Sequence, residues 1–373
     1  MAGELLLVGS VPCETAEDTF TRAGKKIGKY LNYLPDGEVG ERMRWVEFIA
    51  YRCYHGHPDV NTIKRPAPVN GRESREGTDF KNAWMFELKP GVKEYKLGEP
   101  GWRLGYCRDA INSYFIFKTL KKEGVIPEHV RFQVSLPLSA SAVMVFFRKP
   151  EDAEIVMAGL TEAIGEELKN IIAHIPNDQL AIQWDTAIEN TQIERAINEG
   201  RDPVAVAEKL FAPLEGLNAM IPDEVAVGIH ACYGTAEGWP TRQPKDVRGN
   251  VILLNAANSA SARGMQWLHL PTLGDLGDEQ FAPLADLEPK GARVFVGMIH
   301  HLNDLDGMKK QMEQIAKFVP DFGIAAPCGF GRGPEDMATK SDRENRTAKQ
   351  EFVDVVLDDH ATAAELLIKT LKR

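Results

Sequence analysis

Several features that identify common classes of protein are missing from this 373-residue sequence. No stretch has the length of apolar residues that spans a bilayer, and no run of lysine and arginine suits nucleic acid or anionic lipid. The net charge of −10 also disfavours membrane and nucleic-acid partners. The apolar stretch Leu5–Val8 is too short for a signal peptide and follows no basic residues, so we expect a cytoplasmic protein.

Cysteine is also scarce, with five in the chain. So few, and an odd number, do not suit a framework of disulfides. His230 and Cys232 lie just after an apolar run, and Cys328 lies in a similar position near the end of the chain. Alternate residues of a strand share one face, so His230 and Cys232 can chelate one ion, and imidazole and thiolate are ligands of Zn²⁺. If Cys328 joins them, the sequence predicts a zinc site with an open position.

What the sequence does contain is an alternation of short apolar runs and helical segments. The eight runs that we interpret as strands are Leu5–Val8, Tyr30–Leu34, Phe132–Leu136, Leu180–Trp184, Val225–Ile229, Val251–Leu254, Val294–Met298 and Phe322–Ala325. The segments with helical periodicity are Glu14–Ile27, Asp109–Lys122, Glu151–His174, Pro203–Met220, Asp306–Phe318 and Thr347–Leu371.

This alternation predicts an α/β fold with a parallel sheet, and closure of eight strands gives a (β/α)₈ TIM barrel. An open doubly wound sheet is the alternative, although no G-x-G-x-x-G follows the first run. The segment 54–102 breaks the alternation after the second strand. It is rich in glycine, proline and charge, so we interpret it as an inserted loop or subdomain that covers the barrel mouth. No linker divides the chain, so we expect residues 1–373 to form a single domain.

Polar residues follow seven of the eight runs, where a barrel of this kind carries its active site. They are Ser10 after the first run, Asp36 and Glu38 after the second, Asp185, His230 with Cys232, Asn255, His300 and Cys328. Because the carboxyl ends of the strands meet at one rim, we expect these side chains to lie close together.

Short segments in the same order resemble the C-terminal catalytic barrel of cobalamin-independent methionine synthase. They are Val8–Pro12, Asp36–Glu38, Ile182–Asp185, Ile229–Cys232, Ile299–His300 and Pro327–Gly329. The sequence is also similar to the wider superfamily that includes uroporphyrinogen decarboxylase and the zinc enzymes that alkylate coenzyme M. The resemblance implies that His230, Cys232 and Cys328 bind zinc, which holds a thiol substrate as thiolate for attack on an alkyl donor.

The resemblance implies further roles around this metal. Glu38 and Asp185 match positions that hold the amino group of homocysteine in the synthase, and Ser10 matches a loop that contacts the same amino acid. His300 falls where the family has a histidine that can protonate the leaving group, a role for which His301 competes. Asp185, His300 and Glu38 are therefore the catalytic candidates. Independently of the family, the glycines before Arg332 suggest that this arginine binds an anionic group.

The sequence departs from the synthase in three places. The synthase has a glutamate zinc ligand after the sixth strand, where this sequence reads Leu254–Asn258, so the fourth position falls to Asn255, water or substrate. The Asp-Glu-Pro of the family is Asp185-Thr-Ala here, and we expect the adjacent Trp184 to shape a different pocket. The additional N-terminal barrel that binds folate has no counterpart, so we do not expect methionine synthesis from methyl-folate.

The sequence therefore predicts a zinc-dependent alkyltransferase or methyltransferase whose partners are a small thiol and an alkyl donor. The alternative is a zinc-dependent lyase or hydrolase on the same barrel, in which the metal activates water or a substrate oxygen. The missing glutamate favours the alternative, because fewer anionic ligands leave more Lewis acidity, whereas two cysteine ligands soften the ion towards sulfur. Large barrel enzymes often dimerise through their helices, so a homodimer is a further candidate partner.

Overall fold

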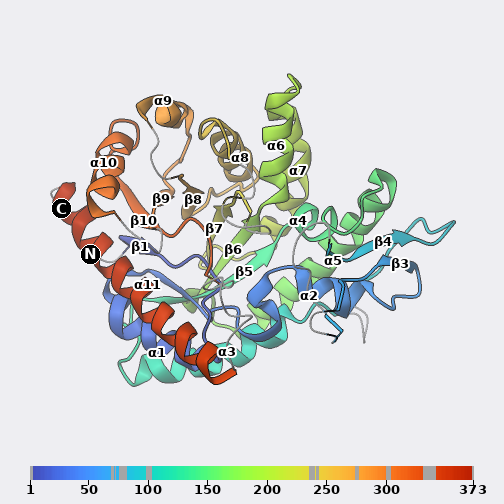
Figure 1. Ribbon diagram of the computed structural model, residues 1–373, viewed down its shortest axis with the longest axis horizontal. Coiled ribbons are helices and arrows are strands. Elements are labelled where there is room, and N and C mark those ends of the chain that lie inside the picture. Colours follow the sequence, from blue (N-terminus) through green and yellow to red (C-terminus); the bar gives the residue numbers. More distant parts are fainter. Residues whose placement is uncertain are drawn as a thin grey trace.

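The computed structural model describes residues 3–68, 71, 73–74, 82–97, 103–234, 240, 243–273, 277–299, 304–330 and 342–371. Eight parallel strands form one sheet in the order β1-β10-β9-β8-β7-β6-β5-β2 (Figure 1). They are β1 (Leu5–Leu6), β2 (Tyr33–Pro35), β5 (Arg131–Pro137), β6 (Leu180–Thr186), β7 (Ala226–Ala231), β8 (Trp267–Pro271), β9 (Arg293–Gly297) and β10 (Phe322–Ala325). An isolated parallel bridge joins Leu5 of β1 to Leu31, two residues before β2, the strand at the other edge of the sheet. The sheet is therefore a nearly closed (β/α)₈ TIM barrel, as the sequence predicts.

Seven of the eight predicted strands are confirmed, and the sixth is wrong. Val251–Leu254 lies inside helix α8 (Arg248–Ser259), and the sixth barrel strand is β8, further along the chain. A run of four apolar residues has no period that separates a buried strand from the buried face of a helix. Here Val251, Leu254 and Ala257 are buried at helical spacing.

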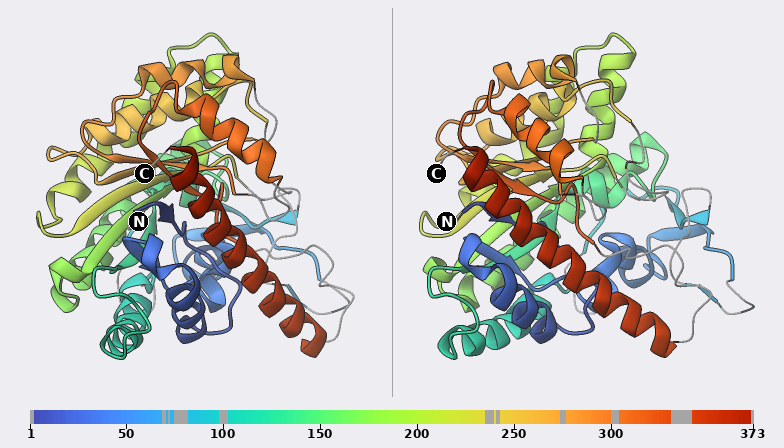
Figure 2. Two further views of the ribbon diagram at one scale, coloured as in Figure 1. Left: turned by 90° about the vertical axis from the view of Figure 1, so that its left-hand side faces the viewer. Right: turned by 60° about the vertical axis from the view of Figure 1, so that its left-hand side comes forward.

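Helices cover the outside of the barrel (Figures 1 and 2). They are α1 (Ala16–Ile27), α2 (Glu47–Ile49), α3 (Tyr106–Lys122), α4 (Ser139–Val143), α5 (Pro150–His174), α6 (Ile188–Asn198), α7 (Pro203–Ala219), α8, α9 (Asp278–Phe281), α10 (Leu305–Ile315) and α11 (Asp342–Thr370). The Asp202 carboxylate accepts the Val204 and Ala205 N–H groups at the start of α7, where Pro203 has no N–H and so needs no acceptor. Among the described residues, none of these helices has both the length and the apolar character needed to cross a bilayer.

The closing helix α11 lies beside α1, so the last barrel helix packs against the first (Figure 2). Arg22 of α1 donates to Asp354 of α11 at 2.9 Å, and Lys26 donates to Asp358 at 2.7 Å. These contacts complete the ring of helices around the sheet.

The lower interior of the barrel is filled by a separate apolar cluster. Its buried members are Leu6, Val8, Ala181, Ala226, Trp267, Phe295 and Ala325. Trp267 is fully buried and stacks on Tyr33 with ring centroids 4.3 Å apart. A Cβ on Gly228 of the neighbouring strand would lie 1.9 Å from the Trp267 ring, so glycine is required there. Because these side chains fill the barrel interior, a pocket can form only at the carboxyl ends of the strands.

Within the segment 54–102, the structure describes a hairpin of β3 (Val60–Lys64) and β4 (Met85–Leu88) that is separate from the barrel sheet. Phe86 of β4 forms a bridge with Phe147, and Ala83 lines the pocket described below. The inserted position after the second barrel strand agrees with the sequence. That the whole segment covers the mouth stays a prediction.

Candidate metal centre and its pocket

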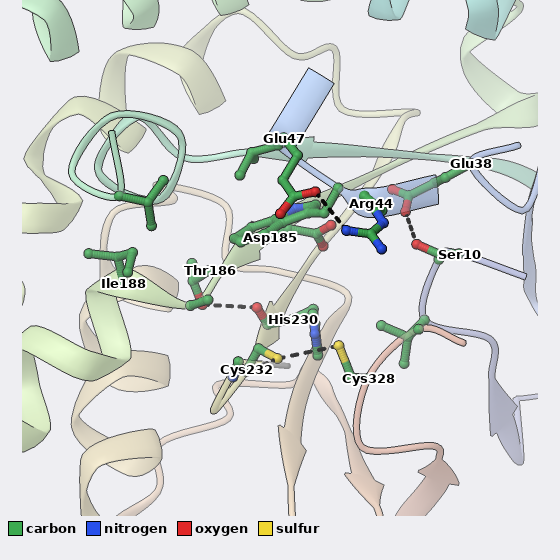
Figure 3. Close-up of a pocket in the computed structure, with 18 of the residues that line it drawn as sticks. Ser10, Glu38, Arg44, Glu47, Asp185, Thr186, Ile188, His230, Cys232 and Cys328 are labelled. Carbon is green, nitrogen blue, oxygen red and sulfur yellow. Dashed lines mark hydrogen bonds and ion pairs between the residues drawn. The ribbon is translucent and has the colours of Figure 1, made fainter. Parts of the chain in front are cut away.

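Three potential metal ligands converge at the carboxyl end of the barrel. His230 is the last residue of β7 whose side chain faces the barrel interior. Cys232 follows two residues later, and Cys328 comes after β10. Their ligand atoms all lie within 4.8 Å of one another, and the two sulfur atoms are 3.4 Å apart (Figure 3). The structure therefore brings together the three residues that the sequence singles out as ligands.

The backbone around the two cysteines holds their sulfur atoms in place. The Gly234 N–H donates to the Cys232 sulfur at 3.2 Å. The loop that carries Cys328 is pinned to the first barrel loop, because the Phe330 N–H donates to the Ser10 carbonyl at 2.7 Å. A Cβ on Gly329 would lie 2.9 Å from the Ser10 nitrogen, so the two loops approach closely only because residue 329 is glycine. The hydrogen bond with Cys232, together with burial, raises the pKa of Cys328 well above its ordinary value.

The imidazole of His230 contacts a second buried histidine, His269 of β8. The two Nδ1 atoms are 2.7 Å apart, and His269 Nε2 lies 3.0 Å from the Ala326 carbonyl oxygen. Burial and the neighbouring His269 lower the pKa of His230 well below its usual value, and burial lowers the pKa of His269 to about 4. Both rings are therefore neutral at physiological pH.

Glu38 reaches the same pocket from the loop after β2. The Ser10 hydroxyl donates to the Glu38 carboxylate (Figure 3). Burial raises the pKa of Glu38 to about 7, while the hydrogen bond from Ser10 and the charge of Arg42 oppose the rise. Glu38 has φ 49°, an uncommon left-handed conformation for a residue with a side chain, so its backbone is held in place by its surroundings.

The support for this turn comes from the buried pair of Asp36 and Arg42. Arg42 Nη2 donates to Asp36 at 2.6 Å, and the Glu38 N–H donates to the same carboxylate at 2.9 Å. Burial acts to raise the pKa of Asp36, but Arg42 and the hydroxyl of Ser113 outweigh it and lower the pKa. A Cβ on Gly37 would lie 2.5 Å from the Thr19 hydroxyl oxygen, so the turn also requires glycine.

Asp185 lies at the end of β6, facing the space between Glu38 and the metal cluster. Burial raises its pKa well above the ordinary value, the nearby charge of Glu38 adds to the rise, and a hydrogen bond from Gln183 opposes it. Asp185 and Glu38 are therefore two buried carboxyl groups with raised pKa values, and burial, together with the charge of Glu38 near Asp185, keeps a proton on the pair near neutral pH.

One pocket of about 150 Å³ joins these groups. Its polar and metal-binding lining residues include Ser10, Glu38, Asp185, His230, Cys232 and Cys328, and its apolar lining residues include Met43, Trp45, Val46, Val145, Phe146 and Ile188. Arg44 and Glu47, which also line the pocket, form an ion pair of 3.3 Å (Figure 3). The pocket thus combines side chains that can bind a metal with side chains that can contact a hydrocarbon group.

Two residues expected in this site lie elsewhere. Asn255 is on α8, where its amide donates to the Asp286 carbonyl at 2.8 Å and accepts the Glu288 N–H at 2.8 Å, so it is not placed to bind the metal. The error follows from the misplaced sixth strand. The Trp184 indole points away from the pocket and donates to Asn218 of α7 at 2.9 Å. Because strand residues alternate, Asp185 faces the interior and Trp184 faces the helices.

The histidine and arginine predicted near the end of the chain, His300 and Arg332, lie outside the described residues. His301, which competes with His300 for its role, lies outside them too. Their roles stay predictions.

The sequence analysis missed His269 and Trp45. A histidine inside the buried stretch Trp267–Pro271 was a usable signal, since a strand with a polar residue facing a barrel interior often marks a site. Nothing in the sequence marks Trp45, whose φ of 58° is a conformational outlier beside the pocket.

No protein-family model matches the chain, and no curated protein matches it. Among solved structures, a methyltransferase from Methanosarcina mazei is 10% identical, with a TM-score of 0.40 over 72% of each chain. A candidate lyase/mutase from Burkholderia cenocepacia J2315 is 12% identical, with a TM-score of 0.33 over 61% of this chain and 62% of that one. Similarity at this level identifies neither a family nor a reaction for this chain.

Proposed function

We propose that this protein is a zinc-dependent alkyltransferase or methyltransferase that acts on a small thiol. The observation that carries the proposal is the convergence of His230, Cys232 and Cys328 in one pocket with two buried carboxyl groups and several apolar side chains. The thiol and the alkyl donor would both bind in that pocket.

The three side chains fit zinc. Two sulfur atoms at ~2.3 Å from a tetrahedral ion lie roughly 3.8 Å apart, and Cys232 and Cys328 need only a small adjustment from 3.4 Å to reach this spacing. The N–H that Gly234 donates to the Cys232 sulfur at 3.2 Å holds this sulfur in position beside Cys328. In the described part of the chain, the cluster offers three ligand atoms, so a four-coordinate ion keeps a position for a substrate.

Zinc bound here would lower the pKa of a thiol in this fourth position, so that its sulfur is anionic at neutral pH. Side chains of the protein would orient the substrates and exclude water. Glu38 and Asp185 can accept an ammonium group of an amino thiol, which would displace the proton that the pair holds and orient the molecule. Trp45, Phe146 and Ile188 would contact the alkyl group and exclude water from it.

A second candidate, a zinc-dependent lyase or hydrolase, is supported by the same two carboxyl groups. With a pKa of about 7, Glu38 can donate a proton at physiological pH, as a general acid must. In that reaction the position beside the cluster would take water or a substrate oxygen rather than sulfur.

Cobalt in place of zinc separates the two candidates. We expect homocysteine or coenzyme M, added to the Co²⁺ protein, to produce a sulfur-to-cobalt charge-transfer band above that of the protein's own cysteines. Asp185→Asn should weaken the binding of homocysteine, which carries an ammonium group, more than that of coenzyme M, which carries none. Cys107 is a half-buried cysteine outside the cluster, so Cys107→Ser is the matched control for Cys232→Ser and Cys328→Ser. The absence of new absorbance with every thiol would favour the lyase or hydrolase.

A further inference from the structure

His269 of β8 lies beside the candidate metal centre, in contact with His230. It pairs in register with His230 of the adjacent strand β7 and is fully buried. Its ring contacts His230 through Nδ1 at 2.7 Å and the Ala326 carbonyl through Nε2 at 3.0 Å. Ala326 stands two residues before Cys328. The ring therefore connects the two arms of the chain that carry the three ligands.

A glycine in the intervening strand β9 leaves room for the His269 ring. Strand order places β9 between β8 and β10, and the His269 ring, although His269 pairs in register with Phe295, reaches the position of Gly297 two residues further along β9. A Cβ on Gly297 would lie 2.9 Å from His269 Nε2 and 2.7 Å from the Pro327 Cα. Real side chains do not approach so closely, so the contact from His269 to Ala326 depends on a glycine at this position.

These contacts fix where the protons are. The Ala326 carbonyl can only accept, so Nε2 of His269 carries a hydrogen. A buried neutral imidazole has one N–H, which leaves Nδ1 of His269 as an acceptor. The hydrogen between the two rings therefore belongs to His230 Nδ1, and the lone pair of His230 is on Nε2.

We infer that His269 is a positioning residue of the metal centre: it holds His230 as the Nδ1-protonated tautomer and so presents Nε2 as the metal-binding atom. An outer-shell hydrogen bond of this kind orients a ligating histidine and strengthens its binding of metal. The inference about zinc affinity rests on the proposed function, whereas the inference about the tautomer concerns the metal-free protein alone.

The tautomer is measured in metal-free protein labelled with ¹⁵N-histidine. Long-range ¹H–¹⁵N correlation spectra distinguish a protonated Nδ1 from a protonated Nε2, and the His230→Gln variant assigns the signals of His230. We expect a protonated Nδ1 in His230 and a protonated Nε2 in His269. A protonated Nε2 in His230 would overturn the inference, whether or not the protein binds zinc.

The consequence for metal is measured with two substitutions of His269. Asn places an amide oxygen where Nδ1 lies and can still accept from His230, whereas Leu cannot. We expect zinc affinity to fall about 10- to 100-fold in His269→Leu and to stay near the wild-type value in His269→Asn. His360→Leu, the same change at a fully buried histidine of α11, controls for the general effect of the substitution. Equal losses in the Asn and Leu variants, or full affinity in His269→Leu, would overturn the role as hydrogen-bond acceptor.

Discussion

The sulfur atoms of Cys232 and Cys328 lie 3.4 Å apart although 96 positions separate the two residues in the sequence. Cys232 follows β7 and Cys328 follows β10, and only β8 and β9 lie between these two strands in the sheet. The curvature of the barrel brings the ends of β7 and β10 close together. Burial and the contact with Cys232 keep Cys328 protonated in the absence of a cation. Two sulfur atoms this close form a site that a divalent ion would convert to a pair of thiolates.

Replacement of Glu38 by Gln should change how stability depends on pH. The pKa of Glu38 is raised from its ordinary 4.5 to about 7. Wild-type protein therefore loses stability as pH rises through this window, because the unfolded chain ionises Glu38 first. We expect the midpoint of thermal unfolding of metal-free Glu38→Gln, relative to wild type, to increase between about pH 4.5 and pH 7 and then level off. A constant difference from pH 4 to pH 8 would contradict the raised pKa.

Removal of Arg42, the buried partner of Asp36, should lower the free energy of unfolding substantially. Arg42→Met leaves an ionised carboxylate that is shielded from water, and breaking such a pair costs about 3–5 kcal/mol of unfolding free energy. Arg195→Met, which breaks the exposed pair with Glu199, is the matched control, with side chains 59% and 43% exposed. The control should lower the unfolding free energy far less, because water screens an exposed ion pair. Urea unfolding of the two variants measures the contrast, and similar losses would show that the Asp36–Arg42 pair does not stabilise the fold.

Two glycine-to-alanine substitutions should act in opposite directions. At Gly228 the new methyl group would lie 1.9 Å from Trp267 inside the barrel, so the strand or the indole must move. We expect a loss of about 3 kcal/mol or more, or failure to fold. At Gly216, in α7, a Cβ meets nothing within 4 Å, so alanine should stabilise by about 0.5–1 kcal/mol. Thermal unfolding of both variants tests the packing, and a stable Gly228→Ala protein would contradict it.

Sequence patterns were sufficient to predict the barrel and the convergence of the three candidate ligands, and insufficient to predict their surroundings. Alternating elements predicted the fold, and a histidine and a cysteine two residues apart predicted a shared interior face. The position of β8 could not be predicted, because the four apolar residues from Val251 suit a helix as well as a strand. The role of His269 depends on the position of β8, and its ring reaches across one neighbouring strand, β9, past Gly297 to Ala326. No local sequence pattern contains such a long-range contact.

The conformation of the pocket wall could not be predicted either. Glu38 and Trp45 both adopt positive φ, which local propensity disfavours for residues with side chains. At Glu38 the buried contacts of Asp36 and Arg42 hold the turn, so tertiary structure overrides local preference. Glu38 and Trp45 both line the pocket, where backbone strain can serve a site, whereas Lys290, which also has positive φ, does not.

Metal analysis of the purified protein tests the central claim most directly. We predict about one Zn²⁺ per chain, with strong loss of zinc in Cys232→Ser and in Cys328→Ser and retention in the Cys107→Ser control. Full zinc occupancy in both ligand variants, or a wild-type protein that takes up no zinc when it is supplied, would contradict the assignment of this metal centre.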